Sequence, residues 1–196
     1  MDDIFLLSFL RARKFDRERA LTLLKNYYLT RRKYPIVFKN LKPSAIEEIL
    51  RQNMLSCVKT DNNMVITVAS YGHWDATKVE ILDVLRVVLL FLDFELNDHP
   101  IQVNGLYLLL DAKDISWRHI IQYTPRNIQL VIMSMVMHLY GSDMKELHKV
   151  IDPKYLPAEF NGELPTFDSS EYIKKLKDNE EFFVENEKYW TEENST

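Results

Sequence analysis

The sequence is poor in the residues that mark several common classes of protein. Its single cysteine, Cys57, permits no internal disulfide and fits a reducing compartment. Its four glycines leave no glycine-rich loop that could cradle phosphates. No uncharged stretch approaches the roughly 18 residues of a membrane-spanning helix. A disulfide scaffold, a nucleotide-binding protein and a transmembrane protein are therefore disfavoured.

A surplus of basic charge is also missing. The net charge is −4 and the isoelectric point about 5.8, whereas a nucleic-acid partner would need a basic face. Hydrophobic residues make up 46% and charged residues 28%, as in ordinary soluble proteins. The length of 196 residues suits one or two domains. The start Met-Asp-Asp lacks the positive region of a signal peptide, so we expect a cytosolic protein.

The first third of the chain has the apolar spacing of helices. Apolar residues recur at three- and four-residue steps between Asp3 and Tyr34. Asp16 is placed to cap the second of two helices, and Pro35 cannot continue it. Another short helix is predicted from Pro43 through Leu50.

The pattern then changes to one typical of strands. Leu55–Lys59 and Met64–Ser70 flank a polar turn and predict a β-hairpin. A long helix follows, from about Ala76 to Leu96, and its second half is apolar on all sides. Val103–Leu110 is an unbroken apolar run, which predicts a strand of a parallel sheet buried on both faces.

The last third continues with mixed elements. We expect a helix from Pro125 to Met135, a strand at Val136–Tyr140 and a helix through Val150. Ser169–Tyr189 predicts one charged amphipathic helix. The order of elements predicts an α/β fold: a helical segment followed by a mostly parallel sheet packed between helices.

Signs of catalysis are weak. His148 and Asp152 stand four residues apart, but a surface ion pair explains this spacing better than a metal site. No serine lies in a nucleophile elbow. Asp111 ends the apolar strand as the nucleophile of an aspartyl-phosphate phosphatase would, but the second acid, Asp114, follows three residues later instead of two. We expect Asp111 to bond loop amides or an arginine, and we predict no catalytic residue, metal ligand or cofactor; a phosphohydrolase is the remaining enzymatic alternative.

Apolar side chains line up on two elements. Leu85, Val88 and Leu92 form one stripe of the long helix, because their spacing is three and four residues. The alternate strand residues share one face of the sheet, by the two-residue period; they are Leu106, Leu108 and Leu110. From these residues alone, a plain core is the favoured interpretation.

Three motifs change that interpretation. FLLSFLRARKFD (Phe5–Asp16), NGLYLLLDAKDISW (Asn104–Trp117) and LPAEFNGELP (Leu156–Pro165), in this order, resemble the CRAL-TRIO (Sec14-like) lipid-binding family, in particular its tocopherol- and retinoid-transfer branch. Members of that family are carriers of one hydrophobic molecule and are not enzymes. The resemblance implies three parts: a truncated helical segment at 1–50, a lipid-binding domain at 51–168 and a charged helix with a tail at 169–196.

The resemblance also implies site residues and partners. The positions that match the family's cavity are Leu85, Val88, Leu92, Leu106, Leu110, Trp117, Tyr123, Val131 and Met135. The second arginine of the RAR motif, Arg13, would help to hold a phosphoinositide such as phosphatidylinositol bisphosphate, and Arg31–Lys33 are weaker candidates. The expected partners are a vitamin E- or retinoid-like lipid and a phosphoinositide membrane, with no nucleic acid. The protein would be a cytoplasmic monomer that associates transiently with membranes.

The chain departs from the family pattern in one place. The family has several tens of residues between the helix that ends near Met135 and the strand matching Val136–Tyr140, and here the two adjoin. That segment supplies a central strand, the lid helix and further basic residues. Its loss would open one wall of the cavity, so we expect the fold class to survive without this strand and lid. An interaction module that keeps the fold without carrying lipid is therefore the second hypothesis.

Overall fold

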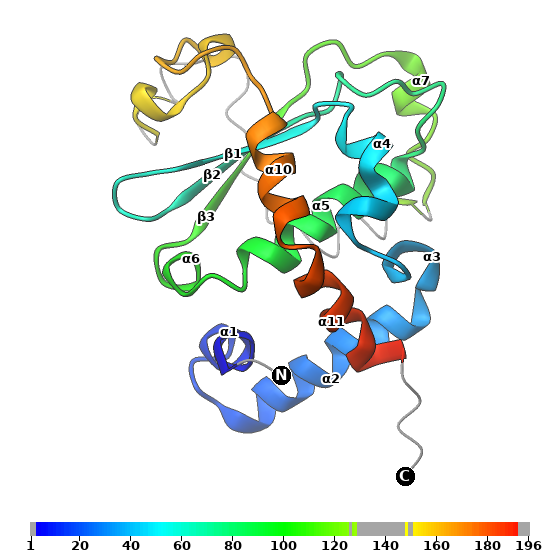
Figure 1. Ribbon diagram of the computed structural model, residues 1–196, viewed down its shortest axis with the longest axis vertical. Coiled ribbons are helices and arrows are strands. Elements are labelled where there is room, and N and C mark those ends of the chain that lie inside the picture. Colours follow the sequence, from blue (N-terminus) through cyan, green and yellow to red (C-terminus); the bar gives the residue numbers. More distant parts are fainter. Residues whose placement is uncertain (1–2, 126, 129–147, 149–150, 192–196) are drawn as a thin grey trace.

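The computed structural model describes residues 3–125, 127–128, 148 and 151–191, which form a small sheet packed against helices (Figure 1). The strands are β1 (Leu55–Lys59), β2 (Val65–Ser70) and β3 (Leu106–Asp111). The α-helices are α1 (Asp3–Ala12), α2 (Arg17–Lys33), α3 (Pro35–Phe38), α4 (Glu47–Leu50), α5 (Ile81–Glu95), α6 (His99–Asn104), α7 (Trp117–Ile120), α10 (Ser170–Asp178) and α11 (Glu180–Thr191). The described residues also form the 3₁₀ helices η1 (Pro43–Ile46), η2 (Pro153–Tyr155) and η3 (Ala158–Phe160).

The sheet has both kinds of strand pairing. β1 and β2 form the predicted antiparallel hairpin, with Leu55 opposite Ala69. β2 and β3 run parallel, with Val65 beside Leu106, and α5 lies in the connection between them. β2 is the middle strand and all six of its residues are buried. The α/β fold class predicted from the sequence is confirmed.

The main core lies between one face of the sheet and the helices. α5 carries it: Leu90 and Phe91 are almost completely buried, as a helix that is apolar on all sides requires. Leu55 of β1 packs into this core from the sheet, and α10, which crosses in front of the sheet in Figure 1, contributes Tyr172 and Leu176. This core therefore covers α5, the long helix whose second half the sequence shows to be apolar on all sides.

The other face of the sheet has a smaller core. Ile66 and Val68 of β2 point to this side. They pack against residues from the last part of the described chain, namely Ile151, Leu156, Phe160 and Phe167. Ile66 and Val68 share this face because they are two residues apart on the strand. The segment containing η2 and η3 closes this face (Figure 1).

The LPAEFNGELP motif builds that closure. Leu156 is fully buried, and its carbonyl accepts the backbone N–H of Leu164 at 3.0 Å. Asn161 adopts the left-handed conformation with φ 54°, which asparagine tolerates better than most residues. A Cβ atom at Gly162 would lie 2.0 Å from the Leu156 carbonyl oxygen, so only glycine fits there. This motif is therefore explained by backbone packing.

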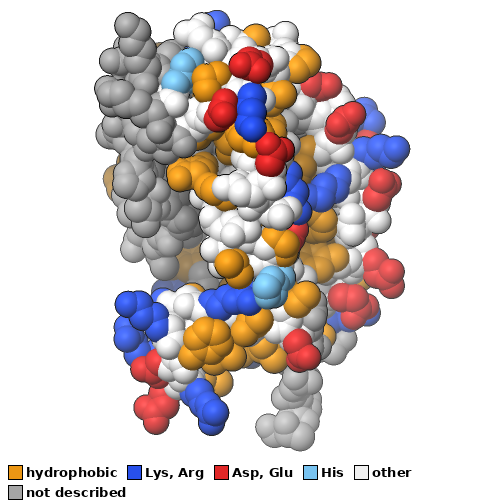
Figure 2. Space-filling model, turned by 90° about the vertical axis from the view of Figure 1, so that its left-hand side faces the viewer, with side chains coloured by type: hydrophobic (Ala, Val, Ile, Leu, Met, Phe, Trp, Pro, Cys, Tyr) orange, Lys and Arg blue, Asp and Glu red, His pale blue; other side chains and the backbone are white. Residues whose placement is uncertain are grey.

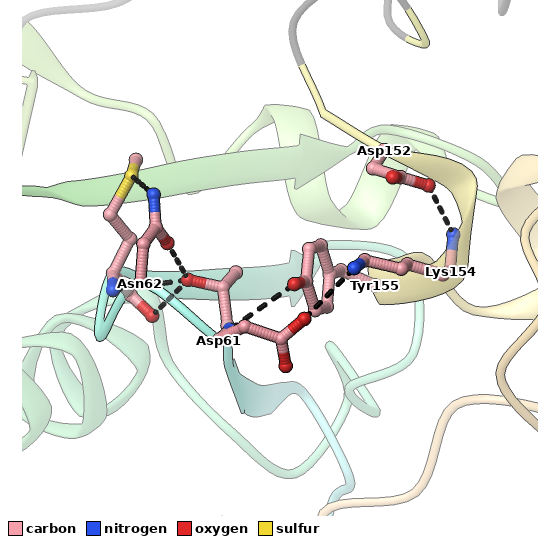
Figure 3. A network of polar contacts seen from close by, with 7 residues as sticks. Asp61, Asn62, Asp152, Lys154 and Tyr155 are labelled. Atoms are coloured by element: carbon pink, nitrogen blue, oxygen red, sulfur yellow. Dashed lines mark hydrogen bonds and ion pairs between the residues drawn. The ribbon is translucent and has the colours of Figure 1, made fainter.

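A polar network attaches the hairpin turn to η2 (Figure 3). The Lys154 ammonium lies 2.9 Å from the Asp61 carboxylate and lowers the pKa of that group. The Asp61 backbone N–H donates to the Tyr155 hydroxyl at 3.1 Å, and Asp152 caps η2 by accepting the Lys154 N–H at 3.1 Å. Because the ion pair is exposed, this network aligns the segments more than it stabilises them.

Two predicted elements begin later than expected. α5 starts at Ile81 and not near Ala76, because Asp75 accepts both the backbone N–H and the hydroxyl of Thr77 and closes a turn there. β3 starts at Leu106 and not at Val103. Val103 belongs to α6, whose start at His99-Pro100 and end at Gly105, with φ 95°, are ordinary helix signals. β3 is also less buried than expected, since none of its six residues is fully buried.

The carboxyl-terminal helix is divided. The predicted helix at Ser169–Tyr189 is α10 followed by α11, with Asn179 between them. The Asn179 side chain donates to the Lys175 carbonyl at 2.8 Å, which offers the backbone an alternative to the next helical bond. The predictions for Asp16 and Pro35 are confirmed, since Asp16 accepts the Arg19 N–H at 3.1 Å and α2 ends before Pro35. The predicted strand at Val136–Tyr140 lies outside the described residues, as does most of the two helices predicted around it.

The two ends of the described chain pack together. α11 lies against α2 (Figure 1), and Arg32 Nε donates to the Trp190 carbonyl at 3.1 Å. Beside this contact Arg31 is buried in an ion pair with Asp93 of α5, with one N–O distance of 2.6 Å. The Arg31 guanidinium also lies 3.4 Å from the centre of the Tyr27 ring. This pair attaches α2, in the amino-terminal helical segment, to α5.

Replacing Arg31 tests this attachment. Arg31→Met should lower the free energy of unfolding by about 3 kcal/mol, because the Asp93 carboxylate, only 12% exposed, would lose its charged partner. Urea denaturation followed by circular dichroism measures the change. Arg51→Met is the control, because the Arg51 guanidinium is exposed and pairs with Glu47 on the surface. Equal stability of the two variants would contradict the assigned role.

Candidate functional site

The helix side of the predicted site is part of the main core. Leu85 and Val88 of α5 are each 4% exposed, and Leu92 is half-buried against the same core. Their common stripe on α5 agrees with the spacing in the sequence. The structure therefore brings these three predicted residues together, and places two of them in close packing with other protein side chains.

The strand side of the predicted site faces the same core. Leu106 packs against it, whereas Leu109 packs against the smaller core on the opposite face. Leu110 lies beside Ala69 in the parallel register and, by alternation, shares the face of Leu106. Leu110 is only half-buried. This face of β3 thus offers apolar surface that the described residues cover only in part.

The remaining predicted residues have different surroundings. Trp117, the first residue of α7, is 71% exposed, so it is a surface residue in this structure. Tyr123 is half-buried against the main core, and desolvation raises the pKa of its hydroxyl. Val131 and Met135 lie outside the described residues.

α7 is held in place by a histidine that the sequence pattern did not single out. His119 is buried, and its Nδ1 accepts the Ser116 N–H at 2.9 Å. The proton therefore sits on Nε2, which donates to the Trp74 carbonyl at 3.0 Å. The His119 and Trp74 rings also meet edge to face, with 4.7 Å between their centres. The contact between His119 and Trp74 could not be inferred from the sequence spacing, since 45 residues separate these two residues.

Two cavities lie in the main core near the predicted site. One is lined by residues of α5 and α10, the other by residues of α5, β2 and the turn after β2, and Met54, Leu55 and Val87 line both. Each has a volume of about 10 Å³. That is room for about one water molecule, whereas pockets for small-molecule ligands measure roughly 300–1,000 Å³. Neither cavity holds a lipid as it stands.

One of these cavities has a polar group in its wall. Trp74 lines it, and the buried Trp74 Nε1 has no hydrogen-bond partner among the described residues. An indole N–H is a donor only, so a water or ligand oxygen is the kind of atom it would bind. Trp74 was not among the predicted site residues.

The basic residues of α1, of α2 and of the turn between these helices have distinct roles. Arg13 follows α1 and donates to the Ala12 carbonyl at 3.0 Å, and it makes no ion pair within the described part of the chain. Arg11 donates to Gln102 Oε1 at 2.5 Å and to His99 Nε2 at 2.7 Å, which ties α1 to α6. Arg31 is buried in its pair with Asp93 and cannot reach a phosphate. Figure 2 shows hydrophobic side chains at the lower end of the face in view, with both basic and acidic side chains around them.

The candidates for catalysis have structural partners. The Asp111 carboxylate accepts the Lys113 N–H at 2.9 Å, as expected for a loop-forming aspartate. His148 Nε2 bonds the Phe160 carbonyl at 2.9 Å, while Asp152 caps η2. Among the described residues no group of three acidic, histidine or cysteine side chains could hold a metal ion. Nor does any helix in this part of the chain have the length and apolarity needed to cross a bilayer.

Comparison with known proteins finds relatives of this chain. No family model matches the chain. Individual proteins do: alpha-tocopherol transfer protein-like of Homo sapiens is 30% identical over 223 residues, covering 94% of this chain and 65% of that protein. Clavesin-2 of Mus musculus is 27% identical over 220 residues, covering 91% of this chain and 67% of the relative. These relatives are CRAL-TRIO proteins, and the chain is similar to them over more than nine tenths of its length.

The comparison also shows how the chain differs from its relatives. It spans 65% of the length of the alpha-tocopherol transfer protein-like proteins, slightly less than two thirds. Within the aligned region, 94% of 196 residues is about 184, whereas the alignment extends over 223 residues. The difference, about 39 residues, agrees with the expected shortening by several tens of residues. Its position after Met135 lies outside the described residues and stays a prediction.

Removing the histidine that holds α7 tests its structural role. His119→Ala should destabilise the protein by about 2 kcal/mol, because the Trp74 carbonyl and the Ser116 N–H would both lose a partner. Thermal and urea unfolding measure this loss. Arg118→Ala changes an exposed neighbour on the same helix and should have little effect. Unfolding curves of His119→Ala that superimpose on those of the wild type would contradict the assignment.

Proposed function

We propose that this protein binds a hydrophobic small molecule of the tocopherol or retinoid kind and transfers it through water. It acts as a cytoplasmic monomer that docks transiently on membranes containing phosphoinositides, and it is not an enzyme. The observation that carries the proposal is the similarity to alpha-tocopherol transfer protein-like proteins over 94% of the chain.

The proposed binding surface is the apolar face of β3 that is turned toward α5. Leu106 and Leu110 would contact the ligand from the sheet and Leu92 from the helix, with Trp117 and Tyr123 at the edge. The partial exposure of Leu110 and the high exposure of Trp117 support this choice, since both would lose contact with water on binding. Burial of apolar surface contributes about 25 cal/mol per Å², which makes an isoprenoid-sized tail a suitable guest.

Contact between a ligand and the α5 residues of the proposed site requires a rearrangement of the core. Leu85 and Val88 are already buried, and the cavities beside α5 are water-sized. A lipid that reaches them must therefore displace side chains that now pack against each other, which subtracts from the affinity. Val131 and Met135 complete the proposed lining.

An interaction module that keeps the fold without carrying lipid is the second candidate. Two observations favour it: the water-sized cavities, and the roughly 39 aligned residues of the relatives that this chain lacks. A phosphohydrolase is less well supported, because the Asp111 carboxylate is engaged by a loop amide.

Lipid binding is tested on the 196-residue protein with a fluorescent tocopherol analogue. We expect saturable binding that Leu110→Gln weakens about tenfold, because an amide would replace apolar contact with the ligand. Tyr107→Gln is the control, since Tyr107 lies on the same strand and points to the opposite face. Equal affinity of the two variants would exclude this face as the site, and the absence of saturable binding in the wild type would favour the interaction module.

Phosphoinositide docking is tested separately at Arg13. Its guanidinium has five donors and makes no ion pair in the described structure, so it is suited to hold a phosphate. Arg13→Ala should weaken binding to vesicles containing phosphatidylinositol bisphosphate about tenfold, as expected for the loss of a charged hydrogen bond. Co-sedimentation measures the affinity, and Lys113→Ala is the control. An unchanged affinity for these vesicles in Arg13→Ala would contradict the role.

A further inference from the structure

Hydrogen bonds at the end of α1 and at the start of α2 hold the backbone of the turn between these helices. The Phe15 N–H donates to the Leu10 carbonyl at 2.7 Å and the Lys14 N–H to the Arg11 carbonyl at 3.0 Å, which is the Schellman arrangement at a helix end. Asp16 then caps α2 directly. Phe15, between these two caps, has little freedom to move its backbone.

The conformation of this turn is unfavourable for its residues. Lys14 has φ 51° and Phe15 φ 64°, so two successive residues with a Cβ adopt the left-handed region. Glycine is the usual residue at the position of Lys14, and each such residue is held at some cost in stability. Strain of this kind often accompanies a functional site.

The turn presents an aromatic ring to water. Phe15 is 62% exposed, although the residue at this position of a Schellman turn usually packs back onto the helix. Within the described residues the Phe15 ring takes no part in the aromatic pairs that join Phe5, Phe9 and Tyr27. A single ring at the apex of a turn is too small for a protein interface, which needs about 800 Å² from each partner.

The charge around Phe15 indicates the partner. Residues 11–19 contain five basic side chains and two acidic ones, a local charge of +3, so the rest of the chain carries −7. The acidic Asp16 is already engaged in capping. The cations are Arg11, Arg13, Lys14, Arg17 and Arg19, and none has an ion pair in the part of the chain that the structure describes. An anionic bilayer, with negative headgroups above an apolar interior, complements both features.

We propose that the Lys14–Phe15 turn is the point at which this protein enters an anionic membrane, with Phe15 inserted among the lipids and the cations of residues 13–19 on the headgroups. The inference rests on the proposed docking function and adds the apolar contact to it. The rigid turn holds the ring ready for insertion, so little conformational freedom is lost on binding.

The experiment measures binding to vesicles of phosphatidylcholine and phosphatidylserine at a 70:30 ratio. Phe15→Ser should weaken binding about five- to tenfold, because the apolar contact is lost while the charge is unchanged. Leu29→Ser is the matched control, since Leu29 is 59% exposed on α2 outside the basic turn, and it should bind like the wild type. Phe15→Trp should retain binding, and brominated lipids should quench its added fluorescence relative to the wild type.

The outcomes separate this inference from the proposed function. Wild-type affinity in Phe15→Ser, or no additional quenching in Phe15→Trp, would overturn the insertion, while loss of phosphoinositide binding in Arg13→Ala would still support docking by charge. Complete competition by a soluble inositol phosphate, with no difference between Phe15→Ser and the wild type, would assign the turn to free phosphate. If the wild type binds no anionic vesicle, docking and insertion both fail, whereas lipid binding at β3 is judged by its own test.

Discussion

The apolar layer between α5 and the sheet is the feature on which the rest of the structure depends. α5 cannot exist alone in water, because apolar residues occur on all of its sides and Leu90 and Phe91 are almost fully buried. The sheet covers it with residues such as Leu55 and Leu106, and α10 covers it with Leu176. The proposed lipid site uses the margin of the same layer. Binding of a guest and stability of the fold are therefore coupled through the same side chains.

The two proposed contact regions lie at different ends of the molecule. The α1–α2 turn is at one end in Figure 1, and α7 with Trp117 is at the other. Both expose large apolar side chains, but only the turn combines them with a strong local surplus of basic charge. The Arg31–Asp93 pair links α2, which carries the turn, to α5. The end of the molecule that we propose to face the membrane is thus attached to the central layer.

Much of the local structure could be predicted because its causes are local. The Asp16 cap, the helix end before Pro35 and the β1–β2 hairpin depend on neighbouring residues, and all three were confirmed. The starts of α5 and β3 were wrong by several residues, because the Asp75–Thr77 turn and the Pro100-to-Gly105 helix signals were outweighed by the apolar pattern. The break at Asn179 was missed for a similar reason: one side-chain bond to Lys175 is invisible to periodicity.

By itself the sequence determined the α/β class, the stripes on α5 and β3 and the resemblance to CRAL-TRIO proteins, because periodicity and ordered motifs record which faces must be buried. Only the tertiary structure decided which charged and polar groups are buried: Arg31 against Asp93, and His119 against Trp74, are partners 62 and 45 residues apart. It also decided that Phe15 and Trp117 face water while Val88 is enclosed. Exposure depends on the packing of distant segments, which the spacing along one chain does not record.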